Sequence, residues 1–378
     1  MEIIRRRNTY PFTFDSQRDS GDIRRKNRGE KRHERDVSRE ASGGDESRRG
    51  DSGGDPSRGG TLGGDPSTGE RERERETTYD HRRKMAEIKC VGVVGAGQMG
   101  SGIAQLAATN GLDVWLMDAD RDALSRATAA ISSSVNRFVS KGLITKEVGD
   151  DAVRRLRLTS NLQDLRSADI IVEAILESED IKKKLFKDLD GIAKSSAILA
   201  SNTSSISITR LASATQRPSQ VIGMHFMNPP PIMKLVEIIR GADTSEETFI
   251  ATKSLAERFG KVTVCSQDYA GFIVNRILMP MINEAFHTLY TGVATKEDID
   301  SGMKHGTNQP MGPLQLADLI GLDVCLSIMK VLHEGLGDSK YAPCPLLVQY
   351  VDAGRLGRKR GMGVYDYRKK PVTPSPRL

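Results

Sequence analysis

Hydrophobic residues between positions 89 and 266 alternate between short continuous runs and longer segments in which they recur every three or four positions. The short runs are rich in Val, Ile and Leu and predict strands buried on both faces, whereas the longer segments predict helices. The predicted strands span residues 89–94, 112–117, 168–175, 197–201, 219–226 and 234–241, and the predicted helices span residues 100–111, about 120–156 and 181–193. This alternation predicts a doubly wound, Rossmann-type α/β domain around a parallel sheet.

The pattern changes beyond residue 273. From there to residue 336 the hydrophobic residues keep helical spacing, and no strand is predicted. We therefore expect a second, all-helical domain, whose wide apolar stripes would be buried against the first domain or against a second subunit. The expected boundaries are residues 85–270 for the first domain and 271–368 for the second.

The first 84 residues have a different composition, dominated by Arg, Glu, Asp, Gly and Ser. Such a segment buries too little apolar surface to offset the entropy of ordering, so residues 1–84 are predicted to form a disordered, low-complexity tail. The pentads "GGDES", "GGDPS" and "GGDPS" recur there every ten residues, which indicates local sequence expansion. Met85 opens the predicted globular part and is a candidate start of the native chain, and residues 369–378 form a second short tail.

Charge and cysteine content argue against several functions. The chain holds 56 Lys and Arg against 50 Asp and Glu, and residues 71–76, "RERERE", alternate in sign. A nucleic-acid-binding arm would be far more one-sided, so no nucleic-acid partner is expected. The four cysteines stand far apart without the spacing of metal ligands, so no metal is expected. No apolar run reaches the ~18 residues that a membrane span needs.

The stretch "VGVVGAGQMG" places Gly95, Gly97 and Gly100 between the first predicted strand and the first predicted helix. This spacing is weak evidence by itself. In a strand–turn–helix context it predicts a loop that holds the pyrophosphate of a dinucleotide at the helix N-terminus. Gln98 and Met99 belong to the same loop and are expected to contact the cofactor.

Asp118 ends the next predicted strand. A carboxylate at this point would accept hydrogen bonds from the adenine ribose hydroxyls and repel a 2′-phosphate. The predicted cofactor is therefore NAD rather than NADP, although Arg121 nearby leaves some room for NADP.

His225 and Glu237 flank the proline-rich part of "HFMNPPPIMKLVEI". Imidazole titrates near neutral pH and can take a hydroxyl proton, and a carboxylate on its other nitrogen would fix its tautomer. The proline-rich loop could turn the chain back and bring the two side chains together. Spacing alone leaves the alternative open that His225 is a core histidine and Glu237 an edge-strand glutamate.

Four stretches carry a specific resemblance: "SNTSSISIT" (201–209), "HFMNPPPIMKLVEII" (225–239), "DYAGFIVNRILMP" (268–280) and "GPLQLADLIGLD" (312–323). Together they resemble the L-3-hydroxyacyl-CoA dehydrogenase family, and within it the short-chain 3-hydroxybutyryl-CoA dehydrogenases. The similarity extends over about residues 88–368. It implies a reversible, NAD-dependent oxidation of the 3-hydroxyl of a short 3-hydroxyacyl-CoA in fatty acid metabolism and β-oxidation.

The resemblance also implies roles for individual residues. His225 matches the catalytic base, Glu237 its partner carboxylate, and Ser204 a serine that touches substrate and cofactor. Asn275 matches a substrate-orienting asparagine. The further implied cofactor contacts are Asn228, Glu177, Lys182 and Lys359, and the implied coenzyme A contacts are Ser134 and Lys141.

Several alternatives stay open when the residues are considered singly. Glu177, Lys182 and Lys141 could be solvated charges, Asn275 could be structural, and Ser204 could belong to an ordinary turn. For the whole protein, the alternatives are another β-hydroxyacid dehydrogenase that acts on a free acid, and a non-catalytic NAD-binding protein of the same fold.

Two further expectations concern partners and location. The resemblance implies a homodimer formed through the helical domain. The chain ends in Pro376-Arg377-Leu378, which resembles the tripeptide read by the peroxisomal import receptor. A peroxisomal location is therefore expected, with the cytoplasm as the alternative.

Overall fold

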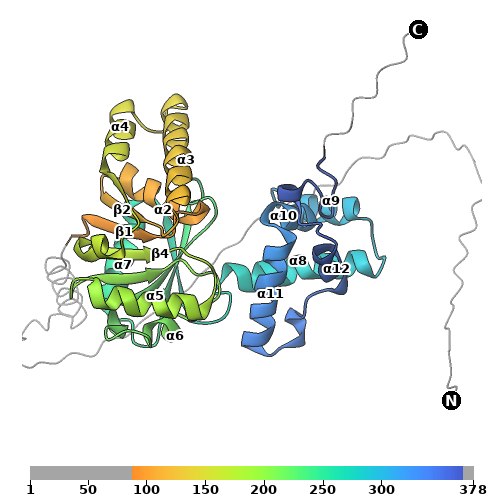
Figure 1. Cartoon of the computed structure of the whole chain (residues 1–378). Coiled ribbons are helices and arrows are strands. Elements are labelled where there is room, and N and C mark those ends of the chain that lie inside the picture. Colours follow the sequence, from red (N-terminus) through yellow and green to blue (C-terminus); the bar gives the residue numbers. More distant parts are fainter. Residues whose placement is uncertain (1–86, 369–378) are drawn as a thin grey trace, which may run out of the picture. The chain divides into compact units, whose positions relative to one another are not determined.

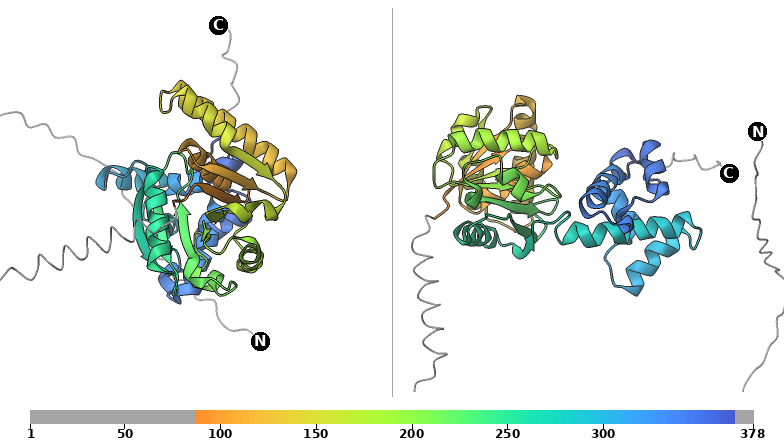
Figure 2. Two further views of the ribbon diagram at one scale, coloured as in Figure 1. Left: turned by 90° about the vertical axis from the view of Figure 1, so that its left-hand side faces the viewer. Right: turned by 90° about the horizontal axis from the view of Figure 1, so that it is seen from below.

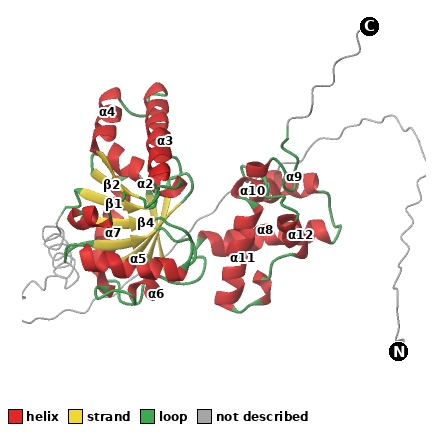
Figure 3. Cartoon of the chain, viewed as in Figure 1, coloured by secondary structure: helices red, strands yellow, loops and turns green. Residues whose placement is uncertain are grey.

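The computed structural model describes residues 87–368 of the chain. The predicted tail of residues 1–84 and the C-terminal tripeptide Pro376-Arg377-Leu378 lie outside the described residues. The described part begins with a sheet covered by helices and continues into a region of helices and loops from Val274 onward (Figure 1, Figure 3).

The sheet has eight strands in the order β3-β2-β1-β4-β5-β6-β7-β8. Their bounds are β1 (Cys90–Val94), β2 (Asp113–Met117), β3 (Leu156–Thr159), β4 (Ile170–Glu173), β5 (Ile198–Ser201), β6 (Val221–Phe226), β7 (Leu235–Arg240) and β8 (Val262–Gln267). The central strands β4, β5 and β6 are buried along their whole length, as their continuous apolar runs predict. The predicted doubly wound α/β domain is confirmed.

Helices cover both faces of this sheet (Figure 2). They are α2 (Gln98–Thr109), α3 (Arg121–Ser140), α4 (Lys146–Arg155), α5 (Glu179–Ile192), α6 (Ile208–Ala212) and α7 (Glu246–Arg258), with short 3-10 turns η1 (Leu162–Ser167) and η2 (Pro218–Gln220). One hydrophobic core joins α2, α3, α4 and α7 to the sheet through residues such as Ile103, Leu124 and Leu255. A second core on the other face joins α5 and α6 through Phe186 and Leu211.

The sequence did not predict the break in one helical region or the two edge strands of the sheet. The helical region expected over about residues 120–156 consists of two helices, because Thr145 caps a new helix with its side chain. The end of this segment forms the edge strand β3, and the unpredicted strand β8 forms the other edge. Most positions of the two edge strands are exposed or half-buried, and neither strand has a long apolar run, so they give a weak hydrophobic signal.

The direction of the last two strands also differs from the expectation of a parallel sheet. The strands from β1 to β6 are parallel, but β7 pairs antiparallel with β6, and β8 runs parallel to β7. The connection from β6 to β7 holds only residues 227–234, too few for the helical crossover that a parallel neighbour requires. The short proline-rich loop therefore makes a hairpin.

The predicted all-helical region is confirmed. It holds α8 (Val274–Tyr290), α9 (Lys296–Gly306), α10 (Pro313–Ile320), α11 (Leu322–Leu336) and α12 (Pro345–Asp352), with 3-10 turns η3 (Ser339–Tyr341) and η4 (Arg358–Arg360). These helices enclose a third core around Phe286, Leu314 and Met329. Within residues 87–368, no helix is long and apolar enough to cross a membrane.

Candidate active site

The glycine loop between β1 and α2 has two positions that the protein's own packing reserves for glycine. A Cβ on Gly95, whose φ is +104°, would lie 2.5 Å from the carbonyl oxygen of Ala174. A Cβ on Gly100 would lie 1.7 Å from the carbonyl oxygen of Gly95. Both contacts are far inside van der Waals distance, so the strand–turn–helix passage requires glycine at both positions.

Gly97 is different, because apart from its chain neighbours no described atom lies within 4 Å of a Cβ built there. The fold itself therefore does not demand glycine at this position. The open space lies at the N-cap of α2, where backbone N–H groups and the helix dipole favour an anion. This is the room that a dinucleotide pyrophosphate would need.

Asp118 follows β2 directly, as predicted. Its Oδ2 accepts a hydrogen bond of 2.7 Å from the Ala96 N–H, and its Oδ1 accepts one of 2.9 Å from the Asp120 N–H. The carboxylate is thereby fixed next to the glycine loop. Each oxygen keeps a lone pair for a ribose hydroxyl.

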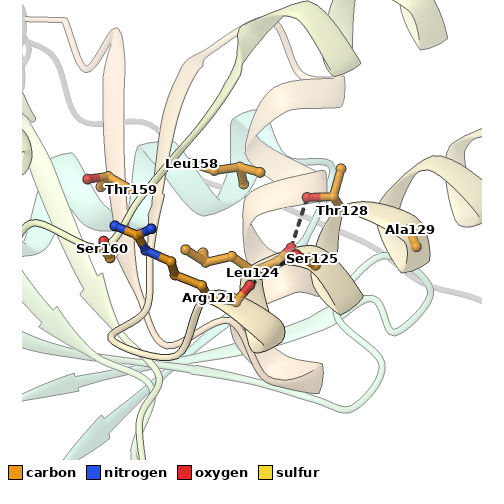
Figure 4. Close-up of a pocket in the computed structure, with 8 residues that line it drawn as sticks. All are labelled: Arg121, Leu124, Ser125, Thr128, Ala129, Leu158, Thr159 and Ser160. Atoms are coloured by element: carbon orange, nitrogen blue, oxygen red, sulfur yellow. Dashed lines mark hydrogen bonds between the residues drawn. The ribbon is translucent and has the colours of Figure 1, made fainter.

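A hollow of about 720 Å³ lies beside this point, between α3 and the end of β3 (Figure 4). Arg121 extends from the first turn of α3 into the hollow, towards Thr159 and Ser160 (Figure 4). Leu124 and Leu158 add apolar surface to its lining. The hollow can therefore take a flat ring with polar edges.

Lys182 is not a solvated charge, because only 1% of its side chain is exposed. Its Nζ lies 2.5 Å from Oε1 of Glu173, at the end of β4, and 3.1 Å from Oε2 of Glu177. Burial raises the pKa of the Glu173 carboxyl, and the charge of Lys182 only partly offsets this effect. For Glu177 burial acts in the same direction, but the charge of Lys182 and hydrogen bonds from Thr203 and Ser204 outweigh it and lower the pKa.

Glu177 in turn organises the "NTSS" loop after β5. Its Oε1 accepts hydrogen bonds from Thr203 Oγ1 (2.5 Å), from the Ser204 N–H (2.9 Å) and from Ser205 Oγ (3.2 Å). Asn202 ties the same loop to β6, because its Oδ1 accepts a 2.8 Å bond from the Phe226 N–H. Ser204 is therefore held in a loop that follows the strand next to His225.

His225 and Glu237 form the pair that spacing alone left open. They face each other directly in the antiparallel register of β6 and β7, and His225 Nδ1 lies 2.7 Å from Glu237 Oε2. His225 is 6% exposed and Glu237 is 0% exposed. The other carboxylate oxygen of Glu237 accepts 3.0 Å bonds from the N–H groups of Ile273 and Val274, at the start of α8.

This contact pattern fixes the chemistry of the imidazole. Nδ1 is occupied by a carboxylate that is itself held from a second side, so the ring orientation is set. The ring of Phe272 packs against it, with centroids 5.8 Å apart. Nε2 is then the nitrogen that can accept a substrate proton.

Two asparagines lie near this pair. Asn275 on α8 is 8% exposed, and its Nδ2 is 3.5 Å from the backbone oxygen of Ser204, at the long limit for a hydrogen bond. Asn228 follows β6, and its Oδ1 accepts a 3.0 Å bond from Gln98 Nε2 on α2. The structure thus links the "NTSS" loop to α8 and the proline-rich loop to the glycine loop.

Four further predicted residues lie on α2, on α3 or its C-cap, and in η4. Ser134 lines a groove between α2 and α3, and Lys141, exposed at the C-cap of α3, lies two helical turns beyond it. Lys359 lies in η4 and pairs with Asp323 at the start of α11, at 2.6 Å. Met99 is half-buried in α2 and packs against the core on that face of the sheet.

Two family models match this chain. The model described as "3-hydroxyacyl-CoA dehydrogenase, NAD binding domain" matches residues 90–269, and the model described as "3-hydroxyacyl-CoA dehydrogenase, C-terminal domain" matches residues 271–367. Together they span the sheet region and the helical region. The chain belongs to the 3-hydroxyacyl-CoA dehydrogenase family.

Similar members of this family include several bacterial proteins. A 3-hydroxybutyryl-CoA dehydrogenase of Bradyrhizobium diazoefficiens is 56% identical over 288 residues, which are 76% of this chain and 98% of the relative. A probable 3-hydroxybutyryl-CoA dehydrogenase of Bacillus subtilis is 53% identical over 284 residues, which are 75% and 99% of the two chains. The crystal structure of (S)-3-hydroxybutyryl-CoA dehydrogenase from Ralstonia eutropha is 48% identical, with a TM-score of 0.73, and covers 75% of this chain and 100% of that chain.

The predicted membership of the 3-hydroxyacyl-CoA dehydrogenase family is therefore confirmed. The chain is an NAD-dependent dehydrogenase, and the glycine loop, the fixed Asp118 and the open space at Gly97 agree with that cofactor.

Sequence reasoning missed three residues that support the site. Glu173 anchors Lys182, and the signal was visible as a carboxylate inside the apolar run of β4. Asp268 accepts hydrogen bonds from the first residues of α6, as an acid at a helix N-terminus should. Lys261 donates hydrogen bonds to the carbonyl oxygens of Pro230 and Met233 at 2.6 and 2.8 Å, and no sequence pattern predicts this contact with the loop.

Proposed function

We propose that the protein oxidises the 3-hydroxyl of a short 3-hydroxyacyl-CoA, with 3-hydroxybutyryl-CoA as the preferred substrate, and catalyses the reverse reduction. The observation that carries this proposal is the His225–Glu237 pair at 2.7 Å beside a nucleotide-binding loop. The named relatives and the Ralstonia eutropha structure support the choice of substrate.

In the proposed mechanism, Nε2 of His225 takes the hydroxyl proton of the substrate. NAD, when bound at the glycine loop, supplies the acceptor for the hydride that leaves C3, and the C3–O bond becomes a ketone. Glu237 stabilises the imidazolium that forms and keeps the ring oriented. Ser204 and Asn275 orient the hydroxyl and the thioester carbonyl, since both offer neutral hydrogen-bonding groups.

The proposed cofactor contacts follow from the same geometry. The loop residues Gly95, Gly97, Gln98, Met99 and Gly100 would form the pyrophosphate site, and Asp118 would hold the ribose. The adenine would extend into the hollow beside Arg121. Asn228 would lie beside the nicotinamide.

Four charged residues enter the proposal in different ways. Glu177 and Lys182 act chiefly through the "NTSS" loop, because the Lys182 ammonium is buried between two carboxylates. Lys359 would reach the cofactor only after leaving Asp323. Lys141 would pair with a phosphate of coenzyme A as a point charge.

The decisive experiment measures NADH formation from (S)-3-hydroxybutyryl-CoA by the wild type and by His225→Gln. We expect the variant to lose turnover by about 10²–10⁴-fold, because the general base is gone, while its affinity for NAD stays unchanged. His305→Gln is the matched control, since His305 is exposed on α9. Near-normal turnover by His225→Gln would refute the assignment of the base.

We infer that the protein forms a homodimer through its helical region. Large apolar side chains are exposed there, including Ile277 (67%), Val293 (75%) and Leu319 (52%). Sedimentation equilibrium checks the state of the wild type, and a monomer mass at micromolar concentration would contradict the inference.

A peroxisomal location stays a prediction that rests on the C-terminal tripeptide alone. The relatives described above come from bacteria, so membership of the family does not bring this location with it. A fluorescent fusion that leaves Pro376-Arg377-Leu378 at the end would show punctate peroxisomal signal, and a diffuse signal would favour the cytoplasm.

A further inference from the structure

We propose that Gln105 is a substrate-binding residue, whose side-chain amide donates a hydrogen bond to a carbonyl of the pantetheine arm of the acyl-CoA. The proposal rests on the proposed function and adds to it a residue for which the sequence predicted no role. It starts from a groove of about 380 Å³ between α2, α3 and the proline-rich loop. Gln98, Gln105, Ser134 and Pro230 are among the residues that line this groove.

Gln105 is an unusual lining residue because its amide has a buried and unused donor. The residue is 3% exposed, and within the described part of the chain its Nε2 finds no hydrogen-bond partner. Buried side-chain donors in native proteins are almost always paired, and an exception calls for a partner that the protein chain itself does not provide. Nε2 is shielded from water, so the side chain turns or flips its amide when a ligand in the groove becomes that partner.

The position of Gln105 along the groove indicates which part of the acyl-CoA lies next to it. Gln98 and Gln105 both line it and lie two helical turns apart on α2, which is about 10 Å along the helix axis. Gln98 binds Asn228, the proposed neighbour of the nicotinamide. A thioester near Asn228 would therefore send its pantetheine arm past Gln105.

The other wall of the groove agrees with this direction. Ala127, Ile131 and Ser134 of α3 line it, and Lys141 lies two turns beyond Ser134. Methylene groups of the arm suit the apolar part of this wall, and the phosphates would reach Lys141. Gln105 lies between the thioester end of the ligand and its phosphates. Its uncharged amide suits a neutral carbonyl of the pantetheine arm, whereas a phosphate is bound best by a cation.

The test compares Gln105→Met with the wild type. Methionine keeps the length of the side chain but has no N–H to donate. We expect KM for 3-hydroxybutyryl-CoA to rise about tenfold, whereas kcat and KM for NAD stay within about twofold. Gln163→Met is the matched control, because Gln163 is exposed in η1, which packs against the core on the other face of the sheet from α2 and α3.

Truncated substrates locate the contact. The 3-hydroxybutyryl thioester of pantetheine keeps both amides of the arm, and the ethyl thioester has none. The difference in KM between Gln105→Met and the wild type should persist with the pantetheine thioester and disappear with the ethyl thioester. A difference that persists with the ethyl thioester would overturn the proposal.

Two further outcomes separate this inference from the proposed function. An active wild type together with an unchanged KM and a lowered melting temperature in Gln105→Met would show that the amide holds a structural water, and would overturn the role of Gln105 alone. A wild type that oxidises no acyl-CoA thioester with NAD would overturn both.

Discussion

At the scale of single residues, Glu237 has two separable tasks. One carboxylate oxygen holds His225, and the other accepts the N–H groups of Ile273 and Val274. In Glu237→Gln the amide oxygen can keep the backbone contacts, but the amide nitrogen presents a donor to Nδ1 and favours the wrong tautomer. We expect kcat to fall by roughly 10²–10⁴-fold with a small change in melting temperature.

Steady-state kinetics and thermal unfolding check this prediction together. Glu246→Gln serves as the control, because Glu246 forms a largely exposed ion pair with Arg240. A large loss of melting temperature in Glu237→Gln would show that the residue acts mainly on folding.

The glycine loop gives a second prediction at this scale. Alanine at Gly97 meets no protein atom, so the free energy of unfolding should change by less than about 1 kcal/mol while NAD affinity falls. Alanine at Gly100 collides with the carbonyl oxygen of Gly95 and should destabilise the fold even without NAD. Thermal unfolding without cofactor and titration with NAD distinguish the two, and equal destabilisation by both variants would contradict the reading of Gly97.

At the scale of elements, α5 is tied to the end of β4 by a buried charge. Lys182→Met would leave Glu173 buried without its cation, which typically costs about 3–5 kcal/mol of unfolding free energy at neutral pH. Lys183→Met on the same helix is the matched control, because Lys183 pairs with Glu179 at the surface and should cost less than about 1 kcal/mol.

The pH dependence of this cost follows from the two carboxylates. Because the pKa of Glu177 is lowered in the folded protein, its ionised carboxylate stabilises the wild type against unfolding. This stabilisation is fully present above the ordinary pKa of a glutamate and is lost as the pH falls through the lowered pKa. In the variant, burial without Lys182 favours protonated Glu173, so acid relieves the defect. The free energy of unfolding in urea should therefore differ more between wild type and Lys182→Met at about pH 8 than at about pH 5. The same difference at both pH values would refute this explanation.

The elements also show which parts of the fold the sequence could predict. The central strands were predictable because burial on both faces gives a continuous apolar run, as in β4 and β6. The edge strand β8 was not, because its exposed side chains carry no such signal. The short connection of residues 227–234 indicates that β7 runs antiparallel to β6, but the register that places His225 opposite Glu237 comes from the pairing of the two strands. Gln105 looked like one more polar residue in a helix until its surroundings were known.

At the scale of the whole molecule, the similarity to known relatives covers about three quarters of this chain, and the family models match residues 90–269 and 271–367. The Bradyrhizobium diazoefficiens relative is covered over 98% of its length by 76% of this chain. We propose that residues 85–270 and 271–368 together supply the full catalytic unit. A chain starting at Met85 should then keep kcat and KM within about twofold of the full chain and unfold at the same temperature, because catalysis depends on positioning within this unit.

Kinetics and thermal unfolding of the two chains side by side check this expectation. The same comparison made with a chain that lacks residues 369–378 is the control for the other terminus. A tenfold loss of kcat on removal of residues 1–84 would mean that this segment takes part in the reaction.

The β6–β7 hairpin has a consequence for how the enzyme can change over generations. His225 and Glu237 are neighbours across one ladder, so insertions or deletions in the connecting loop of residues 227–234 can reshape the groove that its prolines line while the pair survives. A deletion of one residue inside β7 has the opposite effect, because a slip by one position turns every side chain to the other face. Homologues that differ in substrate preference should therefore differ in the length or sequence of that loop. Homologues that keep the reaction should keep the lengths of β6 and β7 unchanged.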